Sequence, residues 1–373
     1  MAKIAILGDL HFGARNDNSV ILDSLCDFLN LQFFPEVKRL GIDTIIQVGD
    51  VFDRRKYINF NTYHKFKQVF LDQIKKNNLK CIIGLGNHDT YWRNTSELNS
   101  VDVLLKEYSK ECGVEYYANP IDFPELDLAL VPWINDDNRD ITMAFMNDLP
   151  SSRTVVGHFE LNGFMLLGGL VQKDGLDPAC LSRFAKVISG HYHIRQQQNN
   201  IWYVGTPIEI SWSDFGNQKC YHFYDTDTKN LQAVPNPDHT FVEFRYNDTT
   251  NAEAVQNILS DTAELFAKFS KKYVRVIIEQ RTQAILFDSL ISGIESTSPE
   301  HLAIFDEGIE KRIAQDNMNS EVVRGDGSPI TILQNYAQTA IADDSSRDKV
   351  MSILSTIYNE AVLLSESIDG EDN

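Results

Sequence analysis

The sequence has no excess of positive charge and no long apolar run. Its 373 residues carry 53 Asp and Glu against 34 Lys and Arg, a formal net charge of −19, which argues against nucleic-acid binding by bulk surface charge. No stretch reaches the ~18 apolar residues that a membrane span needs, and the chain enters an apolar strand at Ile4 with no export signal before it. We therefore expect a cytoplasmic protein without a membrane partner.

Cysteine is scarce, and the charge is uneven. The odd number and wide spacing of the cysteines argue for reduced thiols and against a disulfide framework. Residues 297–373 hold 15 Asp and Glu against 5 Lys and Arg, so any nucleic acid should bind near the front half of the chain. The five cysteines are Cys26, Cys81, Cys112, Cys180 and Cys220.

Polar residues follow five apolar runs, at the points where buried strands should end. In open α/β sheets, ligands bind at the carboxyl ends of the strands, so we expect the five turns to form one site. The turns use five of the nine histidines and no cysteine. They are Gly8-Asp9-Leu10-His11, Gly49-Asp50-Val51-Phe52-Asp53, Gly86-Asn87-His88-Asp89, Gly157-His158 and Gly190-His191-Tyr192-His193.

The order of predicted elements indicates an α/β fold. Strands at 4–7, 44–48 and 80–85 alternate with helices at 18–38 and 61–76, and another helix follows at 98–108. Later strands, at 128–133, 153–157, 164–168, 187–189, 202–204 and 221–224, have fewer helices between them, which favours a partly antiparallel sheet system.

Two prolines at 235 and 237 separate this first domain, residues 1–235, from the rest of the chain. We expect a small α/β module at 240–295. An acidic helical region should follow at 298–366, with Ser298 as the N-cap of its first helix and Pro299 at the first helical position. Its clearest helix, 346–365, has an apolar stripe from Val350 to Leu364 that needs a partner. The tail at 367–373 should be disordered.

The residue types in the turns suit two divalent metals. Asp9 and His11 are two apart, as are His191 and His193, so each pair can reach one centre from an extended chain. Asp50 is the natural bridging carboxylate between two cations. Imidazole, carboxylate and amide donors without a thiolate favour Mn²⁺, Fe²⁺ or Zn²⁺.

His88 is expected to be catalytic rather than a ligand. It adjoins the candidate ligand Asn87 and cannot easily share its direction, so it is better placed to protonate a leaving oxygen. We expect Asp53 or Asp89 to orient its ring. Any one of the five motifs alone would more often be a turn with capping polar groups, whereas the five together point to a metal site. The remaining histidines, which lack this setting, are most simply surface or core residues: His64, His222, His239 and His301.

These motifs resemble the series of the calcineurin-like metallophosphoesterases over roughly residues 1–225. Their order and spacing, with the Gly205-Thr206-Pro207 turn, resemble the SbcD-type DNA double-strand-break repair nucleases, and most of all the recombination endonuclease subunits of phages. Cellular members usually carry His in place of Asp53. The resemblance implies that one metal is held by Asp9, His11, Asp50 and His193, and the other by Asp50, Asn87, His158 and His191, with His88 catalytic.

The resemblance also implies a β-sandwich flanked by helices, a capping domain at 240–295, and C-terminal helices that bind a coiled-coil, SMC-like ATPase subunit. The cofactors would be two divalent ions, with Mn²⁺ the first choice and Mg²⁺, Fe²⁺ or Zn²⁺ as alternatives. The expected function is that of a DNA exonuclease and endonuclease in recombination, repair or replication, in the host cytoplasm if a phage encodes the chain. A homodimer stays open.

DNA contacts are harder to derive from the sequence. Basic residues flank the metal turns, and two aromatic residues beside them are able to stack on a base, although solvated loop tips are an equal alternative for each. The rival functions are a protein or small-molecule metallophosphatase and a scaffold with a vestigial site. The long C-terminal extension argues against the first and the full ligand set against the second. The candidate DNA contacts are Arg15, Arg54, Arg55, Lys56, Tyr91, Trp92 and Arg93.

Overall fold

The computed structural model describes residues 3–109, 112–250 and 264–307, together with 347, 349–351 and 353–354. It divides into two units, Met1–Val276 with Thr282–Ile304, and Ile277–Arg281 with Phe305–Asn373. The predicted tail at 367–373 and most of the helix predicted at 346–365 lie outside the described residues. No helix in the described ranges is long and apolar enough to cross a membrane.

The first sheet has the strand order β12-β11-β1-β2-β3-β4. Strands β1 to β4 are parallel, whereas β11 runs antiparallel to β1 and β12 antiparallel to β11. The predicted mixture of parallel and antiparallel strands is therefore confirmed. The strands are β1 (Lys3–Leu7), β2 (Thr44–Gln47), β3 (Lys80–Gly84), β4 (Val114–Tyr117), β11 (Cys220–Asp225) and β12 (Leu231–Pro235).

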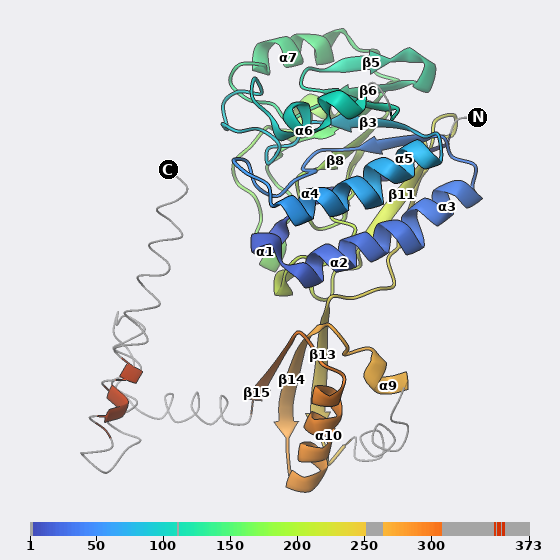
Figure 1. The fold of residues 1–373 in the computed structure, drawn as a ribbon. Helices are drawn as coiled ribbons and strands as arrows, with labels where there is room; N and C mark the ends of the chain where they lie inside the picture. Colours follow the sequence, from blue (N-terminus) through green and yellow to red (C-terminus); the bar gives the residue numbers. More distant parts are fainter. Residues whose placement is uncertain are drawn as a thin grey trace, which may run out of the picture. The chain divides into compact units, whose positions relative to one another are not determined.

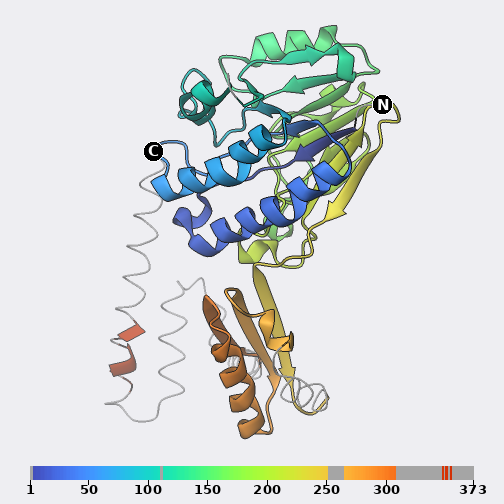
Figure 2. The ribbon, with the colours of Figure 1, turned by 45° about the vertical axis from the view of Figure 1, so that its right-hand side comes forward.

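Helices pack on one face of this sheet, as Figures 1 and 2 show for the blue helices. The predicted start of the first long helix is confirmed, because the Asn18 side chain accepts hydrogen bonds from the backbone N–H groups of Val20 and Ile21. Gly41, with φ +64°, ends it. The helices are α1 (Ala14–Asp17), α2 (Ser19–Asp27), α3 (Phe34–Arg39), α4 (Phe60–Phe66), α5 (Asp72–Lys76) and α6 (Ser100–Ser109), with π-helical turns at Phe28–Phe33 and Lys67–Leu71.

The second sheet has the order β5-β6-β7-β8-β10-β9. The strand predicted at 164–168 is wrong: this stretch pairs only through an isolated bridge between Met165 and Val171, because the glycines around it, such as Gly163 at φ +82°, favour turns. The elements are β5 (Ile121–Phe123), β6 (Leu128–Val131), α7 (Arg139–Asp148), β7 (Thr154–His158), β8 (Lys186–Gly190), β9 (Gln196–Gln198) and β10 (Ile201–Tyr203), with 3-10 turns at Pro124–Leu126, Leu167–Gly169, Pro178–Leu181 and Trp212–Asp214.

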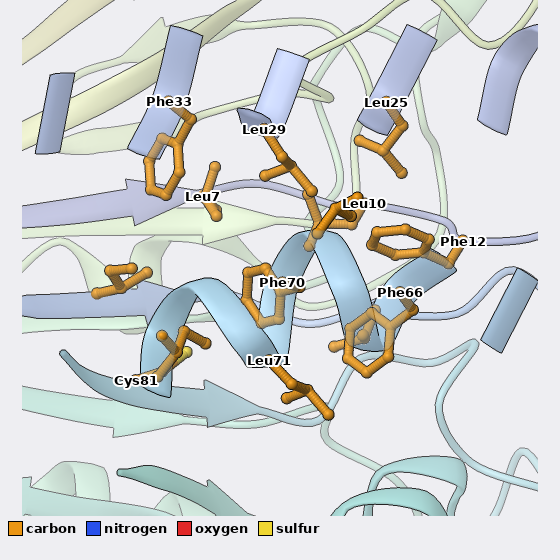
Figure 3. Close-up of a cluster of buried hydrophobic side chains, with 14 of the residues drawn as sticks. Leu7, Leu10, Phe12, Leu25, Leu29, Phe33, Phe66, Phe70, Leu71 and Cys81 are labelled. Carbon is orange, nitrogen blue, oxygen red and sulfur yellow. The ribbon is translucent and has the colours of Figure 1, made fainter. Parts of the chain in front are cut away.

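The core lies on both sides of the first sheet. Along β1, Ala5 and Leu7 pack in the cluster under the helices, which Figure 3 shows, while Ile4 and Ile6 pack in a separate cluster with residues of the second sheet such as Val156. This alternation is expected for a strand that is buried on both faces. The predicted α/β sandwich flanked by helices is confirmed.

A third sheet has the order β13-β14-β15. The prediction of helix from Ser298 onward is wrong for its last strand, because the chain at His301–Asp306 is extended and pairs beside β14 in the sheet. All five cysteines are free, as expected. The elements are β13 (Phe241–Asn247), α9 (Glu264–Ala267), β14 (Tyr273–Gln280), α10 (Ala284–Ser296) and β15 (His301–Asp306).

Candidate metal centre

The five polar turns meet in one place. Three leave the carboxyl ends of the adjacent parallel strands β1, β2 and β3, and two belong to β7 and β8 in the second sheet. Glycines allow the close approach: a Cβ on Gly49 would lie 2.5 Å from Nδ1 of His158, and a Cβ on Gly86 would lie 2.2 Å from Oδ1 of Asp50. The ends of the two sheets therefore present their polar side chains to each other.

Asp9, His11 and His193 form what we call the first group. Ligand atoms of all three lie within 4.8 Å of one another. The Nε2 atoms of His11 and His193 are 3.0 Å apart, and Oδ1 of Asp9 is buried without a hydrogen-bond partner among the described residues. Two imidazole nitrogens and a carboxylate oxygen that face one another in a buried place form a donor set that suits a cation.

Asn87, His158 and His191 form the second group. Oδ1 of Asn87 lies 3.0 Å from Nε2 of His158 and 2.8 Å from Nδ1 of His191. The other ring nitrogen of His158, Nδ1, lies 2.9 Å from the backbone oxygen of Val48, so Nδ1 carries a hydrogen and Nε2 is the nitrogen that faces Asn87 and Asp50. That is the arrangement a metal-binding histidine needs.

Asp50 lies between the two groups. Its Oδ2 atom is 3.4 Å from Nε2 of His158 and 3.8 Å from Nε2 of His11. Its Oδ1 atom accepts a hydrogen bond from the backbone N–H of His88 at 2.7 Å. One carboxylate thus reaches toward both groups, the position that the sequence predicted for the bridging residue.

Burial and charge together keep the histidines in two different states. Burial lowers the pKa of His158, but Asp50 and Asp9 outweigh it and raise that pKa to about 9. For His191 and His193, burial and neighbouring histidines lower the pKa to about 3, so both rings are neutral and can donate a lone pair. The buried carboxylates therefore call for positive charge in a place where two neutral imidazoles can bind it, and the residues fit a metal.

The Asp53 carboxylate does not orient His88, contrary to our prediction. Its Oδ1 atom lies 3.2 Å from Nδ1 of His11, and it is the backbone oxygen of Asp53 that lies 2.5 Å from Nδ1 of His88. Burial lowers the pKa of His11, yet Asp53, Asp50 and Asp9 together raise it to about 9. The geometry was not predictable because turn spacing does not say where a side chain three residues beyond Asp50 points.

Asp89 does not orient His88 either. Its buried carboxylate accepts hydrogen bonds from the backbone N–H groups of Gly86, Asp50 and Val51, at 2.9 to 3.0 Å. It therefore joins the turn after β2 to the turn after β3 and fixes the relative positions of the predicted ligands Asp50 and Asn87.

Backbone strain is concentrated at the site. Three predicted ligands have positive φ without being glycine: His11 at +46°, Asp50 at +54° and His191 at +88°. Such residues cost about 1–3 kcal/mol each and persist only where the surroundings hold them in place. The hydrogen bonds that Asp89 accepts are part of what holds Asp50.

The candidate DNA contacts have different surroundings. Arg54 is engaged within the protein: its Nη1 is 2.9 Å from Oδ2 of Asp17, and its guanidinium lies over the Tyr57 ring. Trp92, 49% exposed, and the exposed Arg93 follow the Asn87 turn, and the partly exposed Tyr91 and Arg55 line a cavity of about 250 Å³. The remaining two, Arg15 and Lys56, are exposed.

Three residues that lie next to the candidate ligands were not singled out from the sequence: Lys219, Asp214 and Trp133. Nζ of Lys219 is buried and donates to the backbone oxygen of His193 at 3.1 Å and to Asp214 at 2.5 Å. The Trp133 ring lies 5.4 Å from the ring of His191. Lys219 had no detectable pattern around it, whereas Pro132 and Trp133, which were placed inside the predicted strand at 128–133, directly follow the shorter strand β6 in the structure.

Comparison with known proteins shows the family of this chain and what it is similar to. A model of the family described as calcineurin-like phosphoesterase matches residues 2–242, a range that contains all five turns. The chain is similar to Exonuclease subunit 1 of Enterobacteria phage T4, with 28% identity over 312 residues that cover 81% of this chain and 88% of that protein. It is also similar to a solved structure titled as a novel archaeal phosphodiesterase, with 12% identity, a TM-score of 0.32 and coverage of 63% of this chain and 99% of the other.

Proposed function

Because this chain belongs to the calcineurin-like phosphoesterase family, we propose that it is a two-metal phosphodiesterase that cuts DNA as an exonuclease and endonuclease. The choice of DNA is supported by the similarity to a protein named Exonuclease subunit 1, which extends over 81% of this chain. The role would lie in recombination, repair or replication, in the cytoplasm of a host cell.

The observation that carries the proposal is the position of Asp50. Its Oδ2 atom lies 3.4 Å from Nε2 of His158 in the second group and 3.8 Å from Nε2 of His11 in the first. Phosphoesterases with two metals need a group shared by cations ~3.5–4 Å apart. We propose that Asp9, His11, Asp50 and His193 hold one ion and that Asp50, Asn87, His158 and His191 hold the other.

Two ions in these positions would polarise the phosphodiester and activate water for attack. The protein's own part is to orient the donors and to move a proton. The Asp53 backbone oxygen accepts from Nδ1 of His88 at 2.5 Å, so Nε2 of the doubly protonated ring would give its proton to the leaving oxygen, and the ring would return to the neutral form with its hydrogen on Nδ1. Asp53 itself takes part through its contact with His11.

Further parts of the proposal concern the metal and the partners. The nitrogen and oxygen donors suit Mn²⁺ first, with Mg²⁺, Fe²⁺ or Zn²⁺ as alternatives. We propose that the chain is a nuclease subunit whose C-terminal region beyond β15, residues 307–366 of the predicted 298–366, binds an SMC-like coiled-coil ATPase. The domain division at 1–235 is kept, and the small module predicted at 240–295 is extended through β15, because His301–Asp306 belongs to its sheet.

The test incubates the full chain and Mn²⁺ with each of two substrates, a DNA hairpin and p-nitrophenyl phosphate. We expect cleavage of a DNA hairpin, loss of cleavage with a chelator, and recovery with added Mn²⁺. His88→Asn should keep both ions and lower the cleavage rate by about 10²–10⁴-fold, the usual share of a general acid. Turnover of p-nitrophenyl phosphate with intact DNA would favour the metallophosphatase instead, and a wild-type rate in His88→Asn would contradict the role of this residue.

A further inference from the structure

A cavity of about 320 Å³ lies beside the second ligand group. His158 forms part of its wall, so the cavity adjoins the candidate metal centre directly. Apolar side chains of Phe159 and Leu176 form another part, and Asn135 and Glu160 add polar atoms. A wall of this mixed kind suits a ligand that has both apolar and polar faces.

Two arginines line the same cavity, Arg93 after the Asn87 turn and Arg139 at the start of α7. Both are exposed, and neither has an ion-pair partner in the part of the chain that the structure describes. By contrast, Arg39, Arg54 and Arg153 each lie within 2.9 Å of a carboxylate oxygen. In a chain with a net charge of −19, two unpaired guanidinium groups beside one cavity provide a place for an anion.

Trp133 connects the cavity to the ligands. Its ring lies 5.4 Å from the ring of His191 and 6.1 Å from that of His158, and it forms part of the cavity wall. The indole N–H is buried and has no acceptor among the described residues. A buried donor without a partner is costly, so Trp133 brings an unused hydrogen-bond donor to the wall of this cavity.

Two carboxylates in the cavity wall limit the chemical class of ligand that can bind there. Glu160 and Asp136 also line the cavity, and Oε1 of Glu160 accepts from the Gln172 side chain at 2.8 Å. A simple anion would be repelled by these two carboxylates. A nucleotide unit meets both requirements, because its phosphate is negative while the amino and imino groups of its base are hydrogen-bond donors.

We propose that this cavity binds the nucleotide adjacent to the scissile phosphodiester, with its phosphate at Arg93 and Arg139 and its sugar and base against Trp133 and Phe159. The proposal rests on the proposed function, since it names where a DNA strand runs after it leaves the metal centre. Arg93 was among the candidate DNA contacts from the sequence; Arg139 and Trp133 were not.

The test measures two reactions of the full chain with Mn²⁺. One substrate is a short single-stranded oligonucleotide, and the other is bis(p-nitrophenyl) phosphate, a diester with no neighbouring nucleotide. Arg93→Ala and Arg139→Ala should each raise the KM for the oligonucleotide about fivefold to tenfold, as expected for an exposed charged hydrogen bond. Each should affect the small diester at least several-fold less. Each should also reduce the slope of log KM against log salt by about 0.7.

Arg39→Ala is the matched control, because it removes the same charge at a residue that adjoins Lys3, at the start of β1 and away from the carboxyl ends. An equal loss on both substrates, or an oligonucleotide KM unchanged in both variants, would overturn the inference and leave the nuclease function standing. A failure of the nuclease function looks different: the wild type would hydrolyse the small diester and leave the oligonucleotide intact, which overturns both proposals.

Discussion

The two ligand groups differ in what holds their histidines in place. In the second group, His158 is held by the backbone oxygen of Val48, and His158 and His191 share the amide oxygen of Asn87. In the first group, His11 faces the carboxylate of Asp53, and the backbone oxygen of His193 faces the ammonium of Lys219. Apart from the carboxylates of Asp50 and Asp9, which lie near histidines of both groups, the second group is thus supported by neutral atoms and the first by charges.

This difference has a consequence for mutagenesis. A backbone oxygen cannot be removed by substitution, so the support of His158 is fixed by the fold itself. The supports of the first group are side chains, and each can be replaced without touching a ligand. We therefore expect the two groups to separate in experiments, with the first group far more sensitive to changes in its surroundings than the second.

The largest effect should come from Asp50, because a single oxygen of its carboxylate, Oδ2, lies near His158 of the second group and His11 of the first. Asp50→Asn should weaken both metal sites together and lower hydrolysis by on the order of 10⁴-fold, as for residues that act as a single catalytic unit. Metal titration by calorimetry and the rate with bis(p-nitrophenyl) phosphate measure this. Asp148→Asn, an exposed position at the end of α7, is the control. Loss of only one ion would show that Asp50 is not shared.

The next largest effect should be on the free energy of unfolding and should come from Lys219, which is buried beside Asp214. Lys219→Met leaves the Asp214 carboxylate without its cation and should lower the free energy of unfolding by about 3–5 kcal/mol. Lys229→Met is the matched control, since its ion pair with Asp127 is at the surface and should contribute under about 1 kcal/mol. Denaturant unfolding measures both.

A second substitution separates charge from packing at this site. Adding Asp214→Asn to Lys219→Met removes the buried unpaired charge and should recover a large part of the lost stability. Stability that stays as low in the double variant would contradict the assignment of the loss to an unpaired carboxylate.

Much of this site could be predicted from the sequence, because each candidate ligand follows an apolar strand. The turns at Asp9, Asp50 and Asn87 are separated by helices that return the chain to the same edge of a parallel sheet, so their convergence follows from the topology. The same reasoning located the two strands of the second sheet that supply His158 and His191.

What failed were the predictions for Asp53 and Asp89, which depend on the direction of a single side chain, and some of those for strands, which depend on pairing with a distant segment. Asp53 was assigned to His88, but its carboxylate turns to His11, which precedes it by about forty residues along the chain. Lys219 was missed because it contacts His193 through a backbone oxygen, which leaves no trace in residue types. The strand His301–Asp306 was mistaken for helix because its partner, β14, outweighed the local signals at Ser298 and Pro299.

Asp53 provides the most selective test of the difference between the first and the second ligand group. Histidine ligands whose second nitrogen faces a carboxylate lose about 10- to 100-fold in metal affinity when that carboxylate is replaced. Asp53→Asn should therefore weaken one of the two sites by this factor and leave the other as in the wild type. The site that weakens should be the first group, because Oδ1 of Asp53 lies 3.2 Å from Nδ1 of His11 and contacts no member of the second group in the described structure.

Calorimetric titration with Mn²⁺ distinguishes this role from a merely structural one. A general loosening of the turn would weaken both sites, since Asp50 is shared, whereas a positioning role affects one. Asp122→Asn is the matched control: its side chain is 28% exposed against 27% for Asp53, and it also pairs with a cation, Arg153, away from the metal centre. Equal weakening of both sites in Asp53→Asn would show that the Asp53 charge does not support the first group selectively. That outcome would contradict the contrast between the two groups.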